Sequence, residues 1–458
     1  MDELPLTLDR DASIPLSRQL ADQLRAAAVR GLLRGGDRLP SSRELARQLA
    51  ISRTVVIATY DQLHAEGWIA GRHGSGTYLT AAPATRPEPT GAQALSDGES
   101  VRYDLAPGAP CVHTIDRAAW RRAWRAAGDR APAAHKRRAG EPEYLAMVTE
   151  HLLRHRGVGP DHDTAVLATS GTGAAVGELA HILLRPGDRI AIEDPGYLRA
   201  VGALRDGGIE VVPVPVDDGG LRVDRIPAGV RAVYCTPAHQ FPLGARMPAD
   251  RRVELVEYAR RHDIWIIEDD YDGELRYDSA PLPLLTTLAP DRVIHLGTTS
   301  KTLSTTLGTG WMVTTGAVAA VVRRYRETTG TCPPPAGQLV FAAFARGGDL
   351  ARHLRRLRRD MPVRRALTVD GLRARGLEVI GDHAGSHVVV RLGSADAEAT
   401  AIAAAREYGV RLDGLARHHI GPRHTFGVAI GYAAVPREVL GTAVDIAAGC
   451  LAEAAESV

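Results

Sequence analysis

Thr299-Ser300-Lys301-Thr302-Leu303 decides how this chain is interpreted, because it contains one of very few lysines. Of the 56 lysine and arginine residues, only Lys136 and Lys301 are lysines. A primary amine can lose its proton and form a Schiff base with an aldehyde, which a guanidinium cannot do. Lys136 lies in the basic run His135-Lys136-Arg137-Arg138, which is typical of a solvent-exposed segment. Lys301 instead follows a strand expected over residues 292–297, so it is the candidate for Schiff-base chemistry.

Two other stretches suit the same chemistry. Residues 169–174 (Thr-Ser-Gly-Thr-Gly-Ala) lie between an expected strand and an expected helix. Small residues there leave the backbone N–H groups of the helix N-terminus free to bind phosphate. Residues 266–271 (Ile-Ile-Glu-Asp-Asp-Tyr) read as an apolar strand that ends in acids, where a carboxylate can pair with the N–H of a protonated pyridine. Either stretch alone also fits an ordinary turn, but together with Lys301 they indicate one site.

Short apolar strands alternate with helical stretches over residues 103–330, the predicted large domain. The expected strands cover residues 165–169, 189–193, 231–236, 264–269 and 292–297. This alternation predicts an α/β fold with a mostly parallel sheet flanked by helices, in which ligands bind at the carboxyl ends of the strands. Residues 331–458, with strands expected at 387–392 and 426–432, are predicted to form a smaller α+β lobe.

Residues 1–80 are predicted to form a separate helical unit with a hairpin. Leu16, Leu20 and Leu24 recur at helical spacing and start a helix that runs toward Leu33 and stops at Gly35-Gly36. A second helix opens at Ser41 or Ser42, and a third follows Ser52-Arg53-Thr54. Two short strands around a Gly-rich turn come after Gly67. Residues 81–102 are rich in Pro, Ala, Gly and Ser and are predicted to be a linker.

The N-terminal unit closely resembles the winged helix-turn-helix of GntR-family regulators. The resemblance rests on residues 39–46 (Leu-Pro-Ser-Ser-Arg-Glu-Leu-Ala), 52–56 (Ser-Arg-Thr-Val-Val) and the Gly-rich run over 67–77. It implies double-stranded DNA as partner, with the third helix in the major groove. The implied DNA contacts are Arg43, Arg53, Thr54 and Gly74, with Arg72 of the hairpin on phosphate. Because residues 1–80 hold ten arginines and nine acidic residues, charge alone also fits a three-helix interaction module.

The larger domain resembles a fold-type I domain of the aminotransferase kind, which binds pyridoxal 5'-phosphate (PLP). Together with residues 193–197 (Glu-Asp-Pro-Gly-Tyr) and 236–244 (Thr-Pro-Ala-His-Gln-Phe-Pro-Leu-Gly), the whole layout resembles the MocR subfamily of GntR regulators. The resemblance implies that Lys301 forms the Schiff base with PLP and that Asp269 pairs with the pyridine nitrogen. Asp270 is the alternative if the register slips by one residue.

The resemblance also implies the rest of the cofactor pocket. Tyr271 would approach the ring hydroxyl and Tyr197 would stack on the ring, although both tyrosines also fit as ordinary core aromatics. The implied phosphate contacts are Ser170, Gly171, Thr172 and Ser300. His239 and Gln240 are further implied members of the pocket.

Three positions depart from the family pattern. The arginine that usually follows the lysine by seven residues and binds the phosphate is Gly308 here, and the tyrosine before the Gly-Glu-Pro step is Ala139. The arginine that binds the substrate α-carboxylate in aminotransferases falls at Ala429. Each missing charge-assisted bond removes about 1.5–3 kcal/mol, so both cofactor affinity and amino-acid turnover are in question. Arg199 remains as a candidate anion contact for the ligand.

The leading hypothesis is a PLP-dependent transcription regulator whose aminotransferase-like domain senses a small-molecule effector, either an amino compound or PLP itself. The resemblance implies a homodimer, with each winged helix packed on the partner chain. One alternative is an active aminotransferase that carries a DNA-binding domain, and another is a degenerate sensor that no longer binds PLP.

Composition narrows the remaining classes of function. No apolar run approaches the roughly 18 residues of a membrane span, and no signal peptide is visible, so a cytoplasmic protein without membrane contact is expected. The four cysteines, at 111, 235, 332 and 450, have no CxxC spacing. The sequence therefore predicts no metal site.

Overall fold

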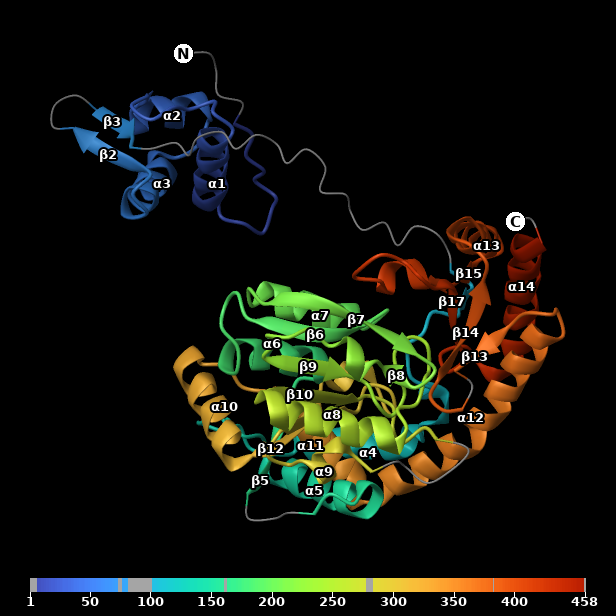
Figure 1. Cartoon of the computed structure of the whole chain (residues 1–458). Helices are drawn as coiled ribbons and strands as arrows, with labels where there is room; N and C mark the ends of the chain where they lie inside the picture. Colours follow the sequence, from blue (N-terminus) through green and yellow to red (C-terminus); the bar gives the residue numbers. More distant parts are fainter. Residues whose placement is uncertain are drawn as a thin grey trace. The chain divides into compact units, whose positions relative to one another are not determined.

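The computed structural model describes residues 6–72, 76–80, 101–159, 163–276, 283–381 and 383–456. The chain divides into two compact units, an N-terminal unit (Met1–Gly98) and a C-terminal unit (Glu99–Val458), which are considered separately (Figure 1). Most of the predicted linker, residues 81–100, lies outside the described residues. Its last residue, Arg102, donates a backbone hydrogen bond to the Gly409 carbonyl, 2.8 Å away, and so belongs to the C-terminal unit.

The N-terminal unit has three helices and a three-stranded sheet of order β1-β3-β2. The elements are α1 (Leu16–Val29), β1 (Arg38–Leu39), α2 (Ser42–Gln48), α3 (Arg53–Ala65), β2 (Ile69–Arg72) and β3 (Gly76–Leu79). Ser41 caps α2 by accepting from Glu44 N, and Ser52 caps α3 by accepting from Val55 N. The expected winged helix-turn-helix architecture is therefore confirmed.

Helix α1 ends earlier than predicted. Its last residue is Val29 rather than a residue near Gly35, because Gly31 adopts the left-handed conformation at φ 73°. Leu32 N then donates to the Ala27 carbonyl at 2.9 Å and Gly31 N to the Ala28 carbonyl at 3.1 Å, which satisfies the last turn. The chain reverses there, and Leu33 is buried in the core of the unit.

The C-terminal unit is built on an eight-stranded sheet of order β5-β12-β11-β10-β9-β6-β7-β8. Its strands are β5 (Thr164–Thr169), β6 (Arg189–Asp194), β7 (Glu210–Asp217), β8 (Gly220–Leu221), β9 (Ala232–Cys235), β10 (Trp265–Asp270), β11 (Val293–Thr298) and β12 (Gly310–Thr315). The sheet is mixed, since β11, β10, β9, β6 and β7 pair in parallel while β12 is antiparallel to β11 and β5. The five predicted strands are present, with ends within about one residue of those expected, but β7, β8 and β12 are not among the predicted strands.

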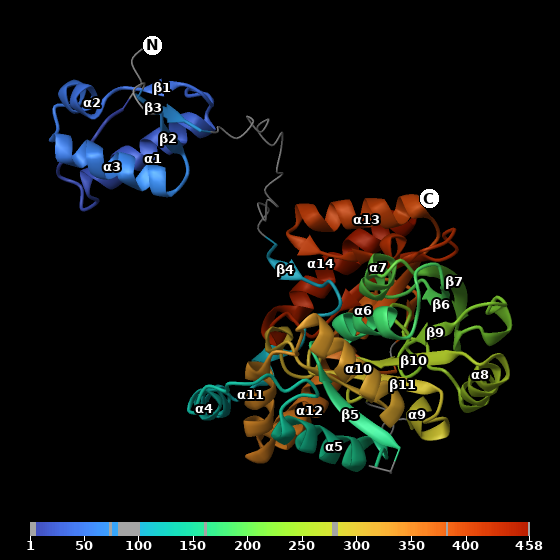
Figure 2. The same cartoon turned by 90° about the vertical axis from the view of Figure 1, so that its left-hand side faces the viewer.

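Helices cover both faces of this sheet. Successive side chains of a strand point to opposite faces, so apolar residues along one strand pack on both sides. Ile190 and Ile192 of β6 pack toward α6 (Thr172–Ile182), α7 (Leu198–Asp206) and α10 (Gly316–Thr329), while Ala191 between them packs toward α8 (Ala249–His262) and α9 (Leu285–Leu288). Figure 2 shows α6 and α10 on one side of the strands and α8 on the other. A third cluster joins α4 (Arg117–Gly128), α5 (Pro142–Arg156) and α11 (Pro335–Arg346).

A smaller lobe contains an antiparallel sheet of order β13-β14-β17-β16. Its elements are α12 (Asp349–Arg373), β13 (Val379–Ile380), β14 (His387–Leu392), α13 (Ala395–Glu407), β15 (Val410–Arg411), β16 (Asp413–Gly414), β17 (Phe426–Gly431) and α14 (Arg437–Glu456). Strand β4 (Tyr103–Asp104) pairs with β15, so Tyr103 and Leu105 pack in this lobe, whereas α11 packs against α4 and α5. Residues from both sides of the predicted division at 330 thus contribute to each lobe.

Short 3-10 helices complete the C-terminal unit at Val112–Thr114 (η1), Val223–Arg225 (η2), Thr305–Leu307 (η3) and Leu415–His418 (η4). No helix among the described residues is both long and apolar enough to span a membrane.

Candidate functional site

The candidate residues of the C-terminal unit meet where parallel strands end. β10 and β11 pair in parallel with Asp269 opposite Leu296, so the acids that end β10 and the turn that follows β11 lie on one edge of the sheet. Lys301 follows β11 in that turn. The charges of Asp269 and Asp272 both act on the Lys301 amine, which places the amine and the two carboxylates in one site.

Asp269 is buried and only half satisfied. Its Oδ2 accepts a hydrogen bond from the Tyr234 hydroxyl at 2.6 Å, while its Oδ1 has no partner among the described residues. Burial raises the pKa of Asp269 to about 6, and the interactions of its carboxylate with the Tyr234 and Thr172 hydroxyls oppose this shift. A buried carboxylate oxygen without a donor is costly, so this atom is well suited to a ligand that brings an N–H group.

The neighbouring acid, Asp270, is paired through its Oδ2, although its Oδ1 also makes no hydrogen bond among the described residues, and it is not among the acids whose charge acts on Lys301. Because side chains alternate along a strand, it points away from Asp269, and its carboxylate forms a buried ion pair with Arg156. Arg156 also donates to the Gly273 carbonyl at 2.9 Å. The geometry therefore favours Asp269 over the alternative Asp270 as the carboxylate that faces the site.

Lys301 holds its amine in a partly enclosed position. Nζ donates to the Gly108 carbonyl at 2.7 Å. Burial lowers the pKa of Lys301, against the opposing effect of Asp272 and Asp269, which favours the neutral, nucleophilic amine. Lys136, by contrast, is exposed and donates to the Gly330 carbonyl at 2.7 Å.

Two turns form a small-residue cradle beside this lysine. Gly171, at φ 106°, is the residue before α6, and a Cβ added to it would lie 4.0 Å from Thr298 Oγ1. Thr298 Oγ1 donates to Ser300 Oγ at 2.9 Å. The turn at Ser170, Gly171 and Thr172 thus lies beside the turn that holds Ser300, with Ser170 exposed at the mouth. Two hydroxyls and a helix N-terminus in one place form a donor set for an anion.

The position of the missing phosphate arginine is open. Gly308 adopts φ 57°, and a Cβ added there would meet no heavy atom within 4 Å. Ala139, the second departure, packs its side chain against the core around α6 while its carbonyl accepts from Ala168 N at 2.7 Å. Neither position brings a charge to the cradle.

The position of the missing carboxylate arginine is closed and apolar. Ala429 is fully buried on β17 between Val389 of β14 and Asp413 of β16. It packs with Val216, Leu243, Val389 and Leu415. The nearby charge is the Asp413 carboxylate, which pairs with Arg417 at 2.6 Å. An anion such as an α-carboxylate therefore finds no cationic side chain at residue 429.

The predicted tyrosines and His239 lie in one aromatic wall. The Tyr271 hydroxyl lies 3.1 Å from His239 Nδ1, and that nitrogen lies 2.8 Å from Asp272 Oδ2. Tyr197 packs edge-on against Phe241, and burial raises the pKa of Tyr197 to about 12. Both phenols therefore stay protonated at neutral pH, and Tyr271 can serve as a hydrogen-bond donor. His239 Nε2 is buried with no partner among the described residues.

The remaining pocket candidates differ in orientation. Gln240 is buried and donates to the Pro195 carbonyl at 2.9 Å and the Phe241 carbonyl at 2.7 Å, so its amide fixes the surrounding loop. Arg199 lies exposed in the first turn of α7, where its charge acts on Lys301 and Tyr197. Of these two, only Arg199 offers a cation to a ligand.

Sequence reasoning missed Tyr234, Asp272 and His387. Tyr234 lies within a buried apolar strand and resembles a core residue in the sequence, although its hydroxyl contacts Asp269. His387 is buried with its ring centroid 5.0 Å from that of His239, and burial moves its pKa well below the ordinary value. For Tyr234 the available signal is a polar hydroxyl inside an otherwise apolar strand, and for Asp272 it is an acid just after the acidic end of β10.

The N-terminal unit presents most of its candidate DNA contacts to solvent. Arg43 on α2 and Arg53 and Thr54 at the start of α3 are exposed. Arg53 Nε donates to Ser42 Oγ at 3.3 Å, which connects the two helices of the helix-turn-helix. Arg72 ends strand β2, but its side chain and Gly74 lie outside the described residues.

Comparison with known proteins now gives the family. Residues 105–445 match the model "Aminotransferase class I and II", and residues 16–79 match "Bacterial regulatory proteins, gntR family". The chain is 33% identical to "Probable rhizopine catabolism regulatory protein MocR" of Rhizobium meliloti, over 94% of this chain and 92% of that protein. It is 35% identical to "HTH-type pyridoxine biosynthesis transcriptional regulator PdxR" of Corynebacterium glutamicum, over 81% of this chain and 82% of that protein.

The chain belongs to the MocR-type transcription regulators. This confirms the family, the fold class and the regulatory function expected from the sequence. The C-terminal unit of this MocR-type regulator is also similar in fold to Pyrococcus horikoshii kynurenine aminotransferase, with a TM-score of 0.71, 24% identity, and coverage of 78% of this chain and 92% of that one.

Proposed function

We propose that this MocR-type regulator binds PLP in the C-terminal unit and uses the occupied pocket to sense an effector that changes DNA binding, without turning over amino acids. The observation that supports it best is the buried Oδ1 atom of Asp269, which has no donor among the described residues while Tyr234 holds the other oxygen. Aminotransferase-type relatives include a structure solved with the amine form of this cofactor. The residues present fit the group.

Each part of the cofactor has a candidate partner in the site. Lys301 would supply the amine for the aldehyde, with a pKa that burial lowers, and Asp269 would accept from the pyridine N–H. Tyr271 would face the ring hydroxyl and Tyr197 the ring plane. The cradle of Ser170, Gly171, Thr172 and Ser300 would bind phosphate, with His239 in the wall behind Tyr271. When bound, PLP supplies an electron sink for a ligand that carries an amine.

The side chains of this pocket would position the ligand and move protons. Asp272 holds the His239 ring, and His239 in turn holds the Tyr271 hydroxyl, so this wall is fixed before any ligand arrives. Lys301 can accept and return a proton once its amine is free. Because residue 429 brings no cation to orient a ligand carboxylate, the chain would lack one of the contacts that positions an amino acid for reaction.

We further infer that the chain works as a domain-swapped homodimer and that the effector is an amino compound or PLP itself. An effector that binds one dimer arrangement more tightly than another shifts the hold of the two winged helices on operator DNA. Paired half-sites one helical turn apart suit such a dimer. Arg43, Arg53, Thr54, Arg72 and Gly74 are the proposed DNA contacts, and Arg199 is the proposed ligand contact.

One set of measurements on the purified chain tests this function. We expect a Schiff-base absorbance band after addition of PLP, and negligible multiple-turnover transamination with common amino acids and a keto-acid acceptor. Steady production of a new amino acid would instead make the chain an active aminotransferase. The complete absence of the band at saturating PLP would favour the degenerate sensor that has lost the cofactor.

A second experiment tests the DNA contacts. Arg53→Ala should weaken binding to the native operator far more than binding to random DNA, because base contacts specify sequence and phosphate contacts do not. Arg47→Ala is the matched control, since Arg47 is an exposed arginine in the last turn of α2. Equal loss on both DNAs would contradict the role of Arg53 as a base reader.

A further inference from the structure

A loop of the smaller lobe is fastened to the end of β6 in the large sheet. Asp194, the last residue of β6, accepts from Ile420 N at 2.7 Å and from Gly421 N at 3.2 Å. Gly196 N donates to the His418 carbonyl at 2.9 Å. The loop between η4 and β17 therefore lies directly on the strand end that precedes Tyr197.

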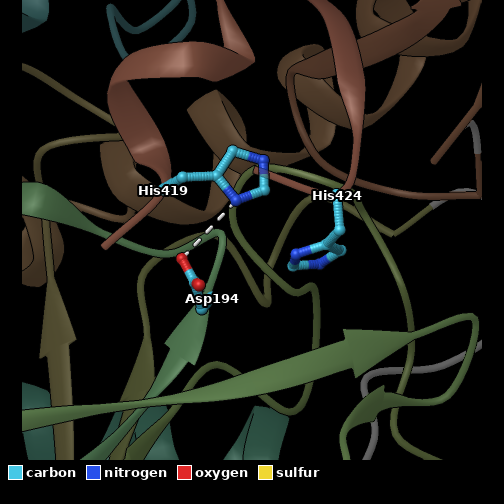
Figure 3. Close-up of side chains that lie close together, drawn as sticks. All are labelled: Asp194, His419 and His424. Atoms are coloured by element: carbon cyan, nitrogen blue, oxygen red, sulfur yellow. Dashed lines mark ion pairs between the residues drawn. The ribbon is translucent and has the colours of Figure 1, made fainter. Parts of the chain in front are cut away.

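Two histidines of this loop gather at the same carboxylate, as Figure 3 shows. Asp194, His419 and His424 each offer one donor atom, and these three atoms all lie within 4.8 Å of one another. His419 Nδ1 is 3.6 Å from Asp194 Oδ1, which is too long for a hydrogen bond. The two imidazole rings lie 4.8 Å apart, edge to face.

The hydrogen bonds of His419 indicate which ring nitrogen has the lone pair. Nε2 lies 3.0 Å from the Thr425 carbonyl, so the proton sits on Nε2. In the neutral ring Nδ1 then carries the lone pair. This atom is buried and makes no hydrogen bond in the described part of the chain, with Asp194 Oδ1 3.6 Å away, and the side chain is only 1% exposed. Metal-binding histidines typically donate their second N–H to a backbone carbonyl in this way.

The Asp194 carboxylate can also bind a metal ion. Its two oxygens each accept one backbone hydrogen bond, Oδ1 from Ile420 N and Oδ2 from Gly421 N. Each carboxylate oxygen has two acceptor sites, so one backbone bond at each oxygen leaves room for a cation.

We propose that Asp194, His419 and His424 bind one divalent transition-metal ion of the zinc class. Two imidazoles and a carboxylate are a usual donor set for such ions, and three protein ligands leave a position for water or a small ligand. Donors about 2.0–2.2 Å from a tetrahedral ion lie roughly 3.4 Å apart. The 3.6 Å between Asp194 Oδ1 and His419 Nδ1 is already close to that spacing, and the exposed His424 supplies the third donor.

Bound metal joins the two lobes beside the proposed cofactor pocket. It holds the loop of residues 415–425 on the end of β6, three residues before Tyr197. This site is separate from Lys301 and Asp269, and its existence does not depend on whether PLP is bound. It makes a transition metal a second input to the regulator.

The test uses the untagged full chain, stripped with a chelator and free of added PLP, titrated with Co²⁺ and followed by its visible absorption. We expect saturation at one Co²⁺ per chain and displacement by Zn²⁺. His424→Ala should weaken Co²⁺ binding by at least about tenfold. His424 is exposed, so this variant should fold normally. The matched control is His262→Ala, an exposed histidine at the end of α8, which should bind Co²⁺ as the unchanged chain does.

Three results would overturn the proposal. The first is the absence of saturable Co²⁺ binding, which would leave His419 and Asp194 as an ordinary buried pair. The second is unchanged affinity in His424→Ala. The third is binding that survives His424→Ala but is lost in His387→Ala, which would assign the ion to the buried group of His239, Asp272 and His387.

Discussion

The ring end of the proposed pocket and its two anion ends are built differently. At the ring end, Asp269 is buried, held by Tyr234 and left with one oxygen without a hydrogen bond among the described residues, and burial lowers the pKa of the Lys301 amine. At the anion ends, Gly308 and Ala429 stand at the two positions where the family pattern leads us to expect arginines. The difference predicts firm attachment of the cofactor at its ring end, with its phosphate held by the cradle alone and a substrate carboxylate without a cation at residue 429.

Among the substitutions that test this comparison, removal of Lys301 should have the largest effect on the attachment of PLP. Lys301→Ala eliminates the amine, so the Schiff-base absorbance band should disappear while the protein stays folded. Absorbance spectroscopy and circular dichroism measure the two outcomes. Lys136→Ala is the control and should keep the band, because Lys136 is exposed and binds the Gly330 carbonyl. A band that survives Lys301→Ala would move the attachment elsewhere.

Loss of the Asp269 charge should have the next largest effect. Asp269→Asn removes a charge-assisted bond of about 1.5–3 kcal/mol, which is roughly a 10- to 100-fold loss of PLP affinity. Tyr234→Phe keeps the carboxylate but removes its 2.6 Å donor, so it should cost roughly 3- to 10-fold. Titration of the absorbance band measures both. A larger loss in Tyr234→Phe than in Asp269→Asn would show that Asp269 is structural.

The same carboxylate should make PLP binding depend on pH. Burial raises the pKa of Asp269 to about 6, so the carboxylate is charged above that pH and becomes neutral as the pH falls through it. Pairing with a protonated pyridine needs the charged form, so PLP affinity should fall below about pH 6. In Asp269→Asn this part of the pH profile should flatten. An identical profile in both proteins would assign the dependence to another group.

A charge restored at the phosphate end should have a smaller effect. Gly308→Arg brings a guanidinium to an open position and should bind PLP roughly tenfold more tightly than Gly308→Ala. Gly308→Ala is the matched control, since both substitutions bear the strain of φ 57° and only one brings charge. Equal affinities would mean that the cradle around Gly171 and Ser300 already satisfies the phosphate.

A charge restored at the carboxylate end should have the smallest effect. Ala429→Arg places its guanidinium beside Asp413, the cross-strand neighbour, which should capture it. Amino-acid binding, measured by the spectral shift of the PLP complex, should therefore stay within about twofold of that in Ala429→Met, which adds bulk without charge. Tight amino-acid binding in Ala429→Arg alone would show that the lost arginine is the main barrier to turnover.

The sequence predicted the parts of the site that follow directly from strand ends. Lys301, Asp269 and the turn at residues 169–174 each follow or end a recognisable apolar strand, and a parallel sheet brings such ends together. Tyr234 lies inside β9 and His387 begins β14, so neither follows the carboxyl end of a strand, and their roles depend on which elements pack against them. Strand β12 was missed for a related reason, since its antiparallel pairing is set by β5 and β11 and not by its own residues.

The hydrogen bond from Lys301 to the Gly108 carbonyl has a consequence outside the pocket. The Gly108 carbonyl, which accepts from Lys301 Nζ, lies six residues after Arg102, the end of the segment that leads from the N-terminal unit. A Schiff base at Lys301 would remove that donor, and a buried carbonyl left without a partner costs about 1–3 kcal/mol unless the turn at residues 107–108 moves. A change at the Lys301 amine would therefore be felt at the start of the C-terminal unit, where Arg102 and Tyr103 bind the Gly409 carbonyl.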